Sequence, residues 1–283
     1  MWHEAKKEGG VAVITGGASG VGLAMAKECA MRGLRVVLAD TSERDMAKAA
    51  HSLSASGTDV RTVKTDVSDP QSVQNLANIA FDVGPVALLM NNAGVALPTK
   101  AWQDPDNWRR MFEVNVFGVL NGVQSFLPRM IEADRPAVVI NTGSKQGITT
   151  PPGNPGYNVS KAGVKVLTEM LAHELRTSKV PVSSHLFVPG FTYTGMIASF
   201  LPEKPASAWT PEEAVTYLMK RLDRGDFYIL CPDNEVTPEI DRKRVAWAAQ
   251  DIIENRPALS RWHPDFAERF AAFEQPDCHA ERV

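Results

Sequence analysis

The stretch VAVITGGASGVG, residues 11–22, decides the fold of this chain. It opens with Val11–Thr15, a short apolar run of the kind that forms a buried strand. A glycine-rich turn follows, and the segment Val21–Met31, closed by Gly33, then predicts a helix. The stretch therefore predicts a strand, a tight turn and a helix in direct succession.

The glycines of this turn suit an anion. They occupy the first, fifth and seventh positions counted from Gly16, which differs from the G-x-G-x-x-G spacing of the common dinucleotide-binding motif. Glycine lets a phosphate approach the backbone, and the free N–H groups and dipole of a helix N-terminus attract it. The alternative is a glycine-rich turn that binds nothing. We predict that the turn from Thr15 to Gly22 binds a pyrophosphate.

The rest of the chain repeats the alternation of short apolar runs and longer amphipathic segments. Further strands are expected at Leu34–Ala39, Val60–Lys64, Val86–Met90, the run from Val138, Val182–Val188 and Asp226–Leu230. Further helices are expected at Glu43–Ser54, Pro70–Phe81 with Asp69 as cap, Pro105–Ile131, Pro155–Thr177 and Pro211–Leu222. Such alternation indicates parallel strands joined by right-handed crossovers. We predict an α/β fold: a Rossmann-type, doubly wound parallel sheet of about seven strands with helices on both faces.

The length of 283 residues is compatible with one large α/β domain. We expect residues 1–283 to form a single domain, with a core at about 10–231 and a C-terminal helical extension at about 232–283. The extension contains two expected helices, Val236–Glu254 and Pro264–Phe273. It is too short to bury a core of its own.

Composition excludes several classes of function. The net charge is −3 with both signs dispersed, which argues against a nucleic-acid partner, and no apolar run is long enough for a signal peptide or a membrane helix. The three cysteines, Cys29, Cys231 and Cys278, are odd in number and far apart, as expected for reduced thiols in a cytoplasmic protein. His263 has no partner at a metal-ligand spacing, so we expect no metal.

Polar residues and prolines follow the expected strands, where ligands of parallel sheets bind. Asp40 ends the second strand, where a carboxylate can accept hydrogen bonds from both adenosine ribose hydroxyls and repel a 2′-phosphate. Its neighbours Ser19 and Thr41 add no positive charge, so the pattern favours NAD over NADP. Asp40 can also cap the helix that starts near Glu43. Asp66 with Val67 is a candidate adenine site, or a plain turn.

A second constellation lies downstream. Tyr157 and Lys161 are four residues apart, so they lie on one helix face a turn apart, and Ser144 follows a strand. A phenol, an ammonium and a hydroxyl together can transfer a proton. Taken alone, the Tyr157 and Lys161 spacing also fits a core ring and a solvated amine.

In combination, these motifs resemble the short-chain dehydrogenase/reductase family. The resemblance covers Val11–Thr194 in order and spacing, with a continuation to Leu230. It rests on the glycine turn, Asn92-Ala93-Gly94, Asn115 within MFEVNVFGV, Ser144, Tyr157-x-x-x-Lys161, and Pro189-Gly190 with Thr194.

The resemblance implies roles for these residues. Tyr157 is implied to be the general acid/base, with its pKa lowered by Lys161 and the nicotinamide ring, while Ser144 positions the substrate oxygen. Asn115 is implied to anchor a water linked to Lys161, or to cap a distortion in its long helix, or both. The cofactor-binding residues implied are Gly16, Ser19, Gly20, Val21, Gly22, Asp40, Asp66, Val67, Asn92, Ala93, Gly94, Tyr157, Lys161, Pro189, Gly190, Thr192 and Thr194.

Two segments depart from the family pattern or vary within it. Lys145 and Gln146 follow Ser144, and both side chains are candidates to face the substrate. For Lys145 we favour the alternative, in which its side chain points to solvent. The segment Phe191–Trp209 corresponds to a mobile substrate lid. Its apolar residues either face substrate or simply pack: Phe191, Tyr193, Met196, Ile197, Phe200 and Trp209.

The sequence thus predicts an NAD-dependent oxidoreductase that interconverts a secondary alcohol and a ketone, assembled as a homodimer or homotetramer. An NADP-dependent carbonyl reductase is one alternative. A catalytically silent NAD-binding sensor or assembly protein is another, although the full set of Asn115, Ser144, Tyr157 and Lys161 argues against it.

Overall fold

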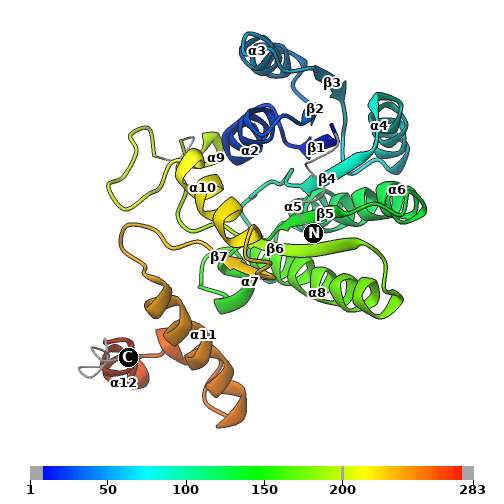
Figure 1. Ribbon diagram of the computed structural model, residues 1–283. Coiled ribbons are helices and arrows are strands. Elements are labelled where there is room, and N and C mark those ends of the chain that lie inside the picture. Colours follow the sequence, from blue (N-terminus) through cyan, green and yellow to red (C-terminus); the bar gives the residue numbers. More distant parts are fainter. Residues whose placement is uncertain (1–8, 199–200, 276–283) are drawn as a thin grey trace, which may run out of the picture.

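A parallel β-sheet forms the centre of the molecule. The computed structural model describes residues 9–198 and 201–275. Seven strands lie in the order β3-β2-β1-β4-β5-β6-β7, and each neighbouring pair is parallel (Figure 1). The strands are β1 (Val11–Thr15), β2 (Arg35–Asp40), β3 (Val60–Lys64), β4 (Val86–Asn91), β5 (Ala137–Thr142), β6 (Val182–Val188) and β7 (Tyr228–Leu230). The predicted doubly wound sheet is confirmed.

Helices cover both faces of the sheet (Figure 1). They are α2 (Gly20–Met31), α3 (Glu43–Ser54) and α10 (Pro211–Leu222) on one face, and α4 (Pro70–Val83), α6 (Gly118–Glu132) and α8 (Pro155–Ser178) on the other. Alternate strand residues feed two separate clusters: Ile14 packs with α2, whereas Val13 packs with α4 and α6. Both faces are therefore buried, which explains the continuous apolar runs of the strands.

Local capping explains why several predicted boundaries agree with the structure. Asp69 accepts a hydrogen bond from the Gln71 N–H with Pro70 at the first position of α4. Thr210 and Glu213 form a reciprocal capping box at the start of α10. Other predicted boundaries differ from the structure by one or a few residues. For example, β2 includes Asp40, and β7 begins at Tyr228 instead of Asp226.

The predicted continuous helix Pro105–Ile131 is wrong in one respect. The structure divides it into α5 (Pro105–Phe112), a π-helical turn η2 (Glu113–Phe117) and α6. Asn115 lies in the widened turn, and its side chain bonds both the N–H of Val95 at 2.8 Å and the C=O of Val95 at 2.9 Å. The distortion foreseen as one role for Asn115 is therefore present, and such turns often occur at functional sites.

The C-terminal extension is a small helical unit beside the β7 edge of the sheet (Figure 1). It comprises α11 (Pro238–Ile253), two 3₁₀ turns, η3 (Ser260–Trp262) and η4 (Pro264–Phe266), and α12 (Ala267–Glu274). The second helix thus begins later than predicted. Trp247 packs against the rings of Phe270 and Phe273, each at 5.2 Å between centroids, and its indole N–H donates to Ser260. Of the helices in the described ranges, none has the length and apolar character needed to span a bilayer.

Candidate active site

Two turns meet where the strand order reverses. β1 lies between β2 and β4, so the chain leaves the sheet in opposite directions on either side of this point, which opens a crevice at the strand ends. The hydroxyl of Thr15 accepts the N–H groups of Asn92 at 2.9 Å and Ala93 at 3.1 Å. Gly16 has φ +64°, and a Cβ on it would lie 3.0 Å from the Cα of Ala93. The glycine turn and the Asn-Ala-Gly turn are therefore locked together in a geometry that requires glycine.

The N-terminus of α2 is open to an anion. Ser19, the exposed N-cap residue, makes no capping hydrogen bond with its side chain. The first N–H groups of a helix lack partners within the helix. In α2 the N-cap side chain does not accept a hydrogen bond from them either. Gly20 has φ +51°, and a Cβ on it would lie 3.2 Å from Cγ2 of Thr194. The turn and Thr194 thus form a narrow cradle, as a pyrophosphate site requires.

Asp40 is tied to this turn. Its carboxylate accepts hydrogen bonds from the N–H of Ala18 at 3.2 Å and the N–H of Ser42 at 3.1 Å. The cap of α3 is Ser42, whose hydroxyl accepts the Asp45 N–H, so the capping role considered for Asp40 is wrong. Asp40 is half-buried beside the glycine turn, where a ribose would lie next to the pyrophosphate.

Asp66 lies past the end of β3 and has strong partners. Its carboxylate accepts the hydroxyl of Ser68 at 2.6 Å and a guanidinium N–H of Arg110 at 3.3 Å. The hydrogen bond from Ser68, helped by Arg110, holds the pKa of Asp66 below its usual value. Val67 is buried, and a Cβ on Gly118 would lie 2.6 Å from its Cγ2, so η2 and α6 pack directly on this turn. Arg110 was not predicted, because a basic residue next to Arg109 on an expected surface helix gives no signal in the sequence.

Ser144, Tyr157 and Lys161 come together at the end of β5. Tyr157 lies in the first turn of α8, close to Ser144, whose hydroxyl favours its phenolate form. The ammonium of Lys161 lies 5.8 Å from the centre of the Tyr157 ring and donates to the Thr142 carbonyl at 2.8 Å. Lys161 is only 5% exposed, so the bland alternative of a solvated amine is wrong.

Burial dominates the titration of this pair. It lowers the pKa of Lys161 to about 8. It also raises the pKa of Tyr157, against the opposing effect of the Ser144 hydroxyl. The protein by itself therefore does not give Tyr157 the lowered pKa that the family resemblance implies; it keeps the phenol protonated.

Asn115 is held close to Lys161. Besides its two bonds to Val95, its amide donates to the hydroxyl of Ser160 at 3.0 Å. A Cβ on Gly94 would lie 3.2 Å from Oδ1 of Asn115 and 3.6 Å from Nζ of Lys161. The Gly94 backbone thus lies between the two side chains, and the Asn-Ala-Gly turn joins the cofactor crevice to the Tyr157 centre.

The segment after β6 packs on the loop after β7. A Cβ on Gly190, next to Pro189, would lie 2.5 Å from the carbonyl oxygen of Pro232. The N–H of Tyr193 donates to Trp209 O, and Trp209 N–H to Phe191 O, each at 2.8 Å, so the two ends of the expected lid are joined. The hydroxyl of Tyr193 donates to the carbonyl of Pro202 at 2.7 Å. Thr192 is buried at this junction. The side chain of Met196 and all of Phe200 lie outside the described residues.

Lys145 does not point to solvent as expected. Its ammonium lies 2.7 Å from a carboxylate oxygen of Asp241 in α11 and 3.7 Å from one of Asp233 in the loop after β7. Gln146 begins a short helix, α7 (Gln146–Thr149), that was expected as loop, and its N–H donates to the hydroxyl oxygen of Ser144 at 3.2 Å. Asp233 was missed although it follows a strand, the same signal that indicated Asp40 and Asp66.

The comparisons with known proteins agree with this geometry. The family model for short chain dehydrogenases matches residues 10–205. The chain belongs to the short-chain dehydrogenase/reductase family. It is 33% identical to 1-deoxy-11-beta-hydroxypentalenate dehydrogenase from Streptomyces exfoliatus, over 77% of this chain and 81% of that one. It is therefore an oxidoreductase.

Solved structures of relatives extend the likeness. A short chain dehydrogenase/reductase from Burkholderia phymatum, in complex with NAD, superposes with a TM-score of 0.81 and 33% identity, over 89% of this chain and 96% of that one. The apo form of LigO from Sphingobium sp. strain SYK-6 superposes with a TM-score of 0.75 and 28% identity, over 96% of this chain and 99% of that one. Because the second match spans 96% of this short-chain dehydrogenase/reductase, it reaches into the C-terminal extension.

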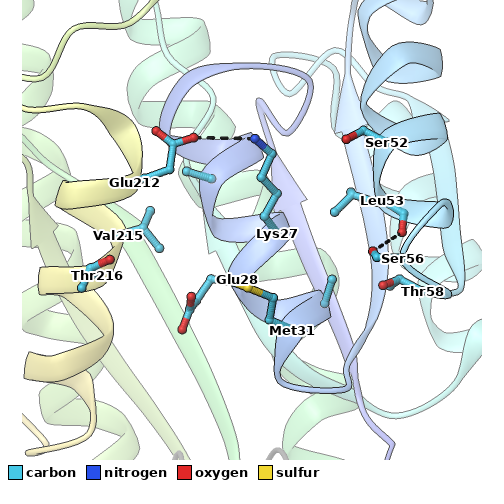
Figure 2. A pocket seen from close by; sticks show the side chains of 12 residues that line it. Lys27, Glu28, Met31, Ser52, Leu53, Ser56, Thr58, Glu212, Val215 and Thr216 are labelled. Carbon is cyan, nitrogen blue, oxygen red and sulfur yellow. Dashed lines mark hydrogen bonds and ion pairs between the residues drawn. The ribbon is translucent and has the colours of Figure 1, made fainter.

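One surface pocket of this short-chain dehydrogenase/reductase lies away from the site. It has a volume of about 580 Å³ and lies over α2, between α3 and α10 (Figure 2). Figure 2 shows the ion pair of Lys27 and Glu212, 3.6 Å apart, between α2 and α10. None of the residues that line it is a predicted site residue, so we assign it no part in the chemistry.

Proposed function

We propose that this protein is an NAD-dependent short-chain dehydrogenase/reductase that interconverts a secondary alcohol and a ketone, with Tyr157 as the general acid/base. The observation that carries the proposal is the placement of Ser144 and Tyr157 beside the buried ammonium of Lys161. The name of the relative from Streptomyces exfoliatus, 1-deoxy-11-beta-hydroxypentalenate dehydrogenase, supports a reaction at a hydroxyl group.

The residues of the chain divide the proton chemistry among them. In carbonyl reduction Tyr157 donates its proton to the substrate oxygen, and in alcohol oxidation its phenolate accepts the hydroxyl proton. Ser144 accepts the N–H of Gln146, so its hydroxyl hydrogen serves as the donor, to the phenolate of Tyr157 and to the substrate oxygen. We assign Lys161, whose ammonium lies 5.8 Å from the centre of the Tyr157 ring, the electrostatic support of the phenolate. NAD, when bound, supplies hydride transfer.

The cofactor residues that we propose are those implied by the family resemblance. The open N-terminus of α2 and the glycine cradle suit the pyrophosphate, and Asp66 with Val67 suits the adenine. Lys161 suits the nicotinamide ribose, with Asn92 and Gly94 along the crevice, and Pro189, Gly190, Thr192 and Thr194 at its nicotinamide end. NAD in the relative from Burkholderia phymatum supports this assignment.

Asp40 is the basis for proposing NAD over NADP. Its carboxylate can accept both ribose hydroxyls and repels a 2′-phosphate. Lys64 lies opposite Asp40 in the strand register, but its ammonium is 3.0 Å from Glu43. A carboxylate thus already neutralises the cation that an NADP-dependent carbonyl reductase would use here.

Substrate contacts are proposed for Gln146, Phe191, Tyr193 and Met196 around the strand ends. Lys145 is removed from this set. Its ammonium is held by two carboxylates, so it does not offer a site for an anionic group of a substrate. A substrate without a negative charge therefore suits this side of the site.

We also propose one domain for residues 1–283, a cytoplasmic location and a homodimer or homotetramer. The ion pairs of Lys145 to the extension support one domain, and the buried free thiols of Cys29 and Cys231 support a reducing compartment. Exposed apolar side chains on η2 and α8 support an oligomer; they are Phe117, Val159, Val166 and Met170.

The direct test is binding followed by turnover. Quenching of NADH fluorescence measures the cofactor, and a panel of secondary alcohols with NAD measures the reaction. Binding of NADH with turnover of at least one alcohol supports the proposal. Binding without turnover on any alcohol or ketone supports the sensor alternative, and absence of binding contradicts both.

A further inference from the structure

A buried charge cluster connects the Ser144 segment to the C-terminal extension. It consists of the Lys145 ammonium with the carboxylates of Asp241, at 2.7 Å, and Asp233, at 3.7 Å. The side chains of Asp241 and Asp233 are only 8% and 6% exposed. Carboxylates this buried require a partner, because an uncompensated buried charge is strongly unfavourable. Lys145 supplies that partner for both.

The cation belongs to the residue next to Ser144. Lys145 is the N-cap residue of α7, and the following N–H, from Gln146, donates to Ser144 Oγ at 3.2 Å. A Cβ on Gly147 would lie 2.4 Å from the backbone carbon of Lys161, so α7 packs directly on the α8 backbone. A shift of Lys145 therefore moves a hydrogen-bond partner of Ser144 and a helix that packs against Lys161.

The carboxylates come from parts of the chain outside the Tyr157 centre. Asp241 lies in the first turn of α11, and Asp233 lies between β7 and that helix. Asp233 also accepts the N–H of Phe191 at 3.3 Å and the N–H of Val236 at 2.7 Å. One carboxylate thus holds the start of the lid segment and the approach to α11 while facing Lys145.

We propose that Asp241 and Asp233 are positioning residues for Ser144, and that they act through Lys145 and α7. This inference rests on the proposed function, because it assigns the C-terminal extension a part in that reaction. The extension thereby fixes the distance between the Ser144 hydroxyl and the Tyr157 phenol without touching substrate. A misplacement of about 1 Å in such a site lowers the rate by about 10²-fold.

Asp241→Asn tests the proposal, because it removes the charge and keeps the shape. Amide hydrogen exchange of the protein without ligand is the first readout, at Gly147, Ile148 and Thr149, whose N–H groups donate to the carbonyls of Ser144 and Lys145. The second readout is steady-state kinetics, which separates an effect on kcat from an effect on the KM for NAD. We expect faster exchange in α7, a loss of about 10- to 100-fold in kcat and an unchanged KM for NAD.

Glu274→Gln is the matched control. Glu274 pairs with Arg244, one turn beyond Asp241 on α11, at 2.6 Å, and this pair joins α11 to α12 without reaching Lys145. We expect this control to behave as wild type in both readouts. Asp241→Glu keeps the charge and should recover most of the lost kcat.

A second variant covers the case in which Asp241→Asn does not fold. Lys145→Gln breaks the same ion pair from the other side, and the double variant should lose no more kcat than the worse single variant. The proposal is overturned if α7 exchanges as in wild type, or if exchange rises while kcat stays unchanged. A wild-type protein without turnover on any alcohol or ketone instead contradicts the proposed function, while the exchange result still decides whether the cluster holds α7.

Discussion

Ser144, just past β5, lies beside Tyr157 at the start of α8, and its hydroxyl favours the phenolate of that residue. This effect opposes the effect of burial on the pKa of Tyr157. Because Lys161 is buried one turn further along α8, a hydroxyl, a phenol and an ammonium share one enclosed site. The account of function depends on this relationship.

Removal of the Ser144 hydroxyl tests its part. Ser144→Ala should lower kcat by about 10²- to 10³-fold, because one preorganised donor to the substrate oxygen is lost. The same change should raise the pKa of Tyr157 further. Steady-state kinetics over a pH series measures both effects. Ser144→Thr keeps the hydroxyl and should retain much of the activity; equal losses in the two variants would contradict the hydrogen-bonding role.

The lowered pKa of Lys161 predicts a pH-dependent stability. The folded value is about 8 and the reference value is 10.5, so between these values the unfolded chain binds more protons and stability rises with pH. Wild type should therefore gain on the order of 1–3 kcal/mol relative to Lys161→Met from pH 8 to pH 10.5. Urea unfolding of both proteins across this range measures the difference. A difference that stays constant with pH would show that Lys161 is not perturbed by burial.

Asp40 should determine the choice of cofactor. Asp40→Ala should weaken NADH binding by about 10- to 100-fold, because hydrogen bonds from the ribose hydroxyls to a charged acceptor are lost. NADPH binding should weaken less or improve, since the repulsion of the 2′-phosphate is also lost. Fluorescence titration of both nucleotides measures the ratio. Asp45→Asn, in the first turn of α3, is the control and should leave this ratio unchanged.

The exposed apolar face of α8 should form a subunit interface. Val166 and Met170 are 55% and 52% exposed and lie one helical turn apart on α8. Met170→Lys should convert the homo-oligomer to smaller species in light scattering. Ile252→Lys is the matched control, because Ile252 is 86% exposed but lies on α11. If only the control variant dissociates, the subunit interface lies on the extension and not on α8.

Much of the fold was predictable because local signals agreed with each other. The bounds of Glu43–Ser54, Val60–Lys64, Val182–Val188 and Pro211–Leu222 are as expected, since apolar periodicity and capping residues mark them. The order of chemical motifs likewise identified the family before any geometry was known.

The features that local patterns did not indicate depend on distant contacts. The π-turn at Asn115, which only the family resemblance implied as one role of that residue, is accompanied by its bonds to Val95. The direction of the Lys145 side chain depends on its ion pair with Asp241, a residue of the extension that lies outside the family pattern. The pKa of Tyr157 is expected to fall beside Lys161 and a bound nicotinamide, whereas in the protein alone burial raises it, and burial is a property of the folded site.

The most direct test of the central claim is Tyr157→Phe, which removes the phenolic hydroxyl and keeps the ring. Its kcat and its affinity for NADH should be measured together against wild type. The account predicts a loss of about 10²- to 10⁴-fold in kcat with NADH binding largely kept. Wild-type turnover in Tyr157→Phe would contradict the assignment of Tyr157 as the general acid/base.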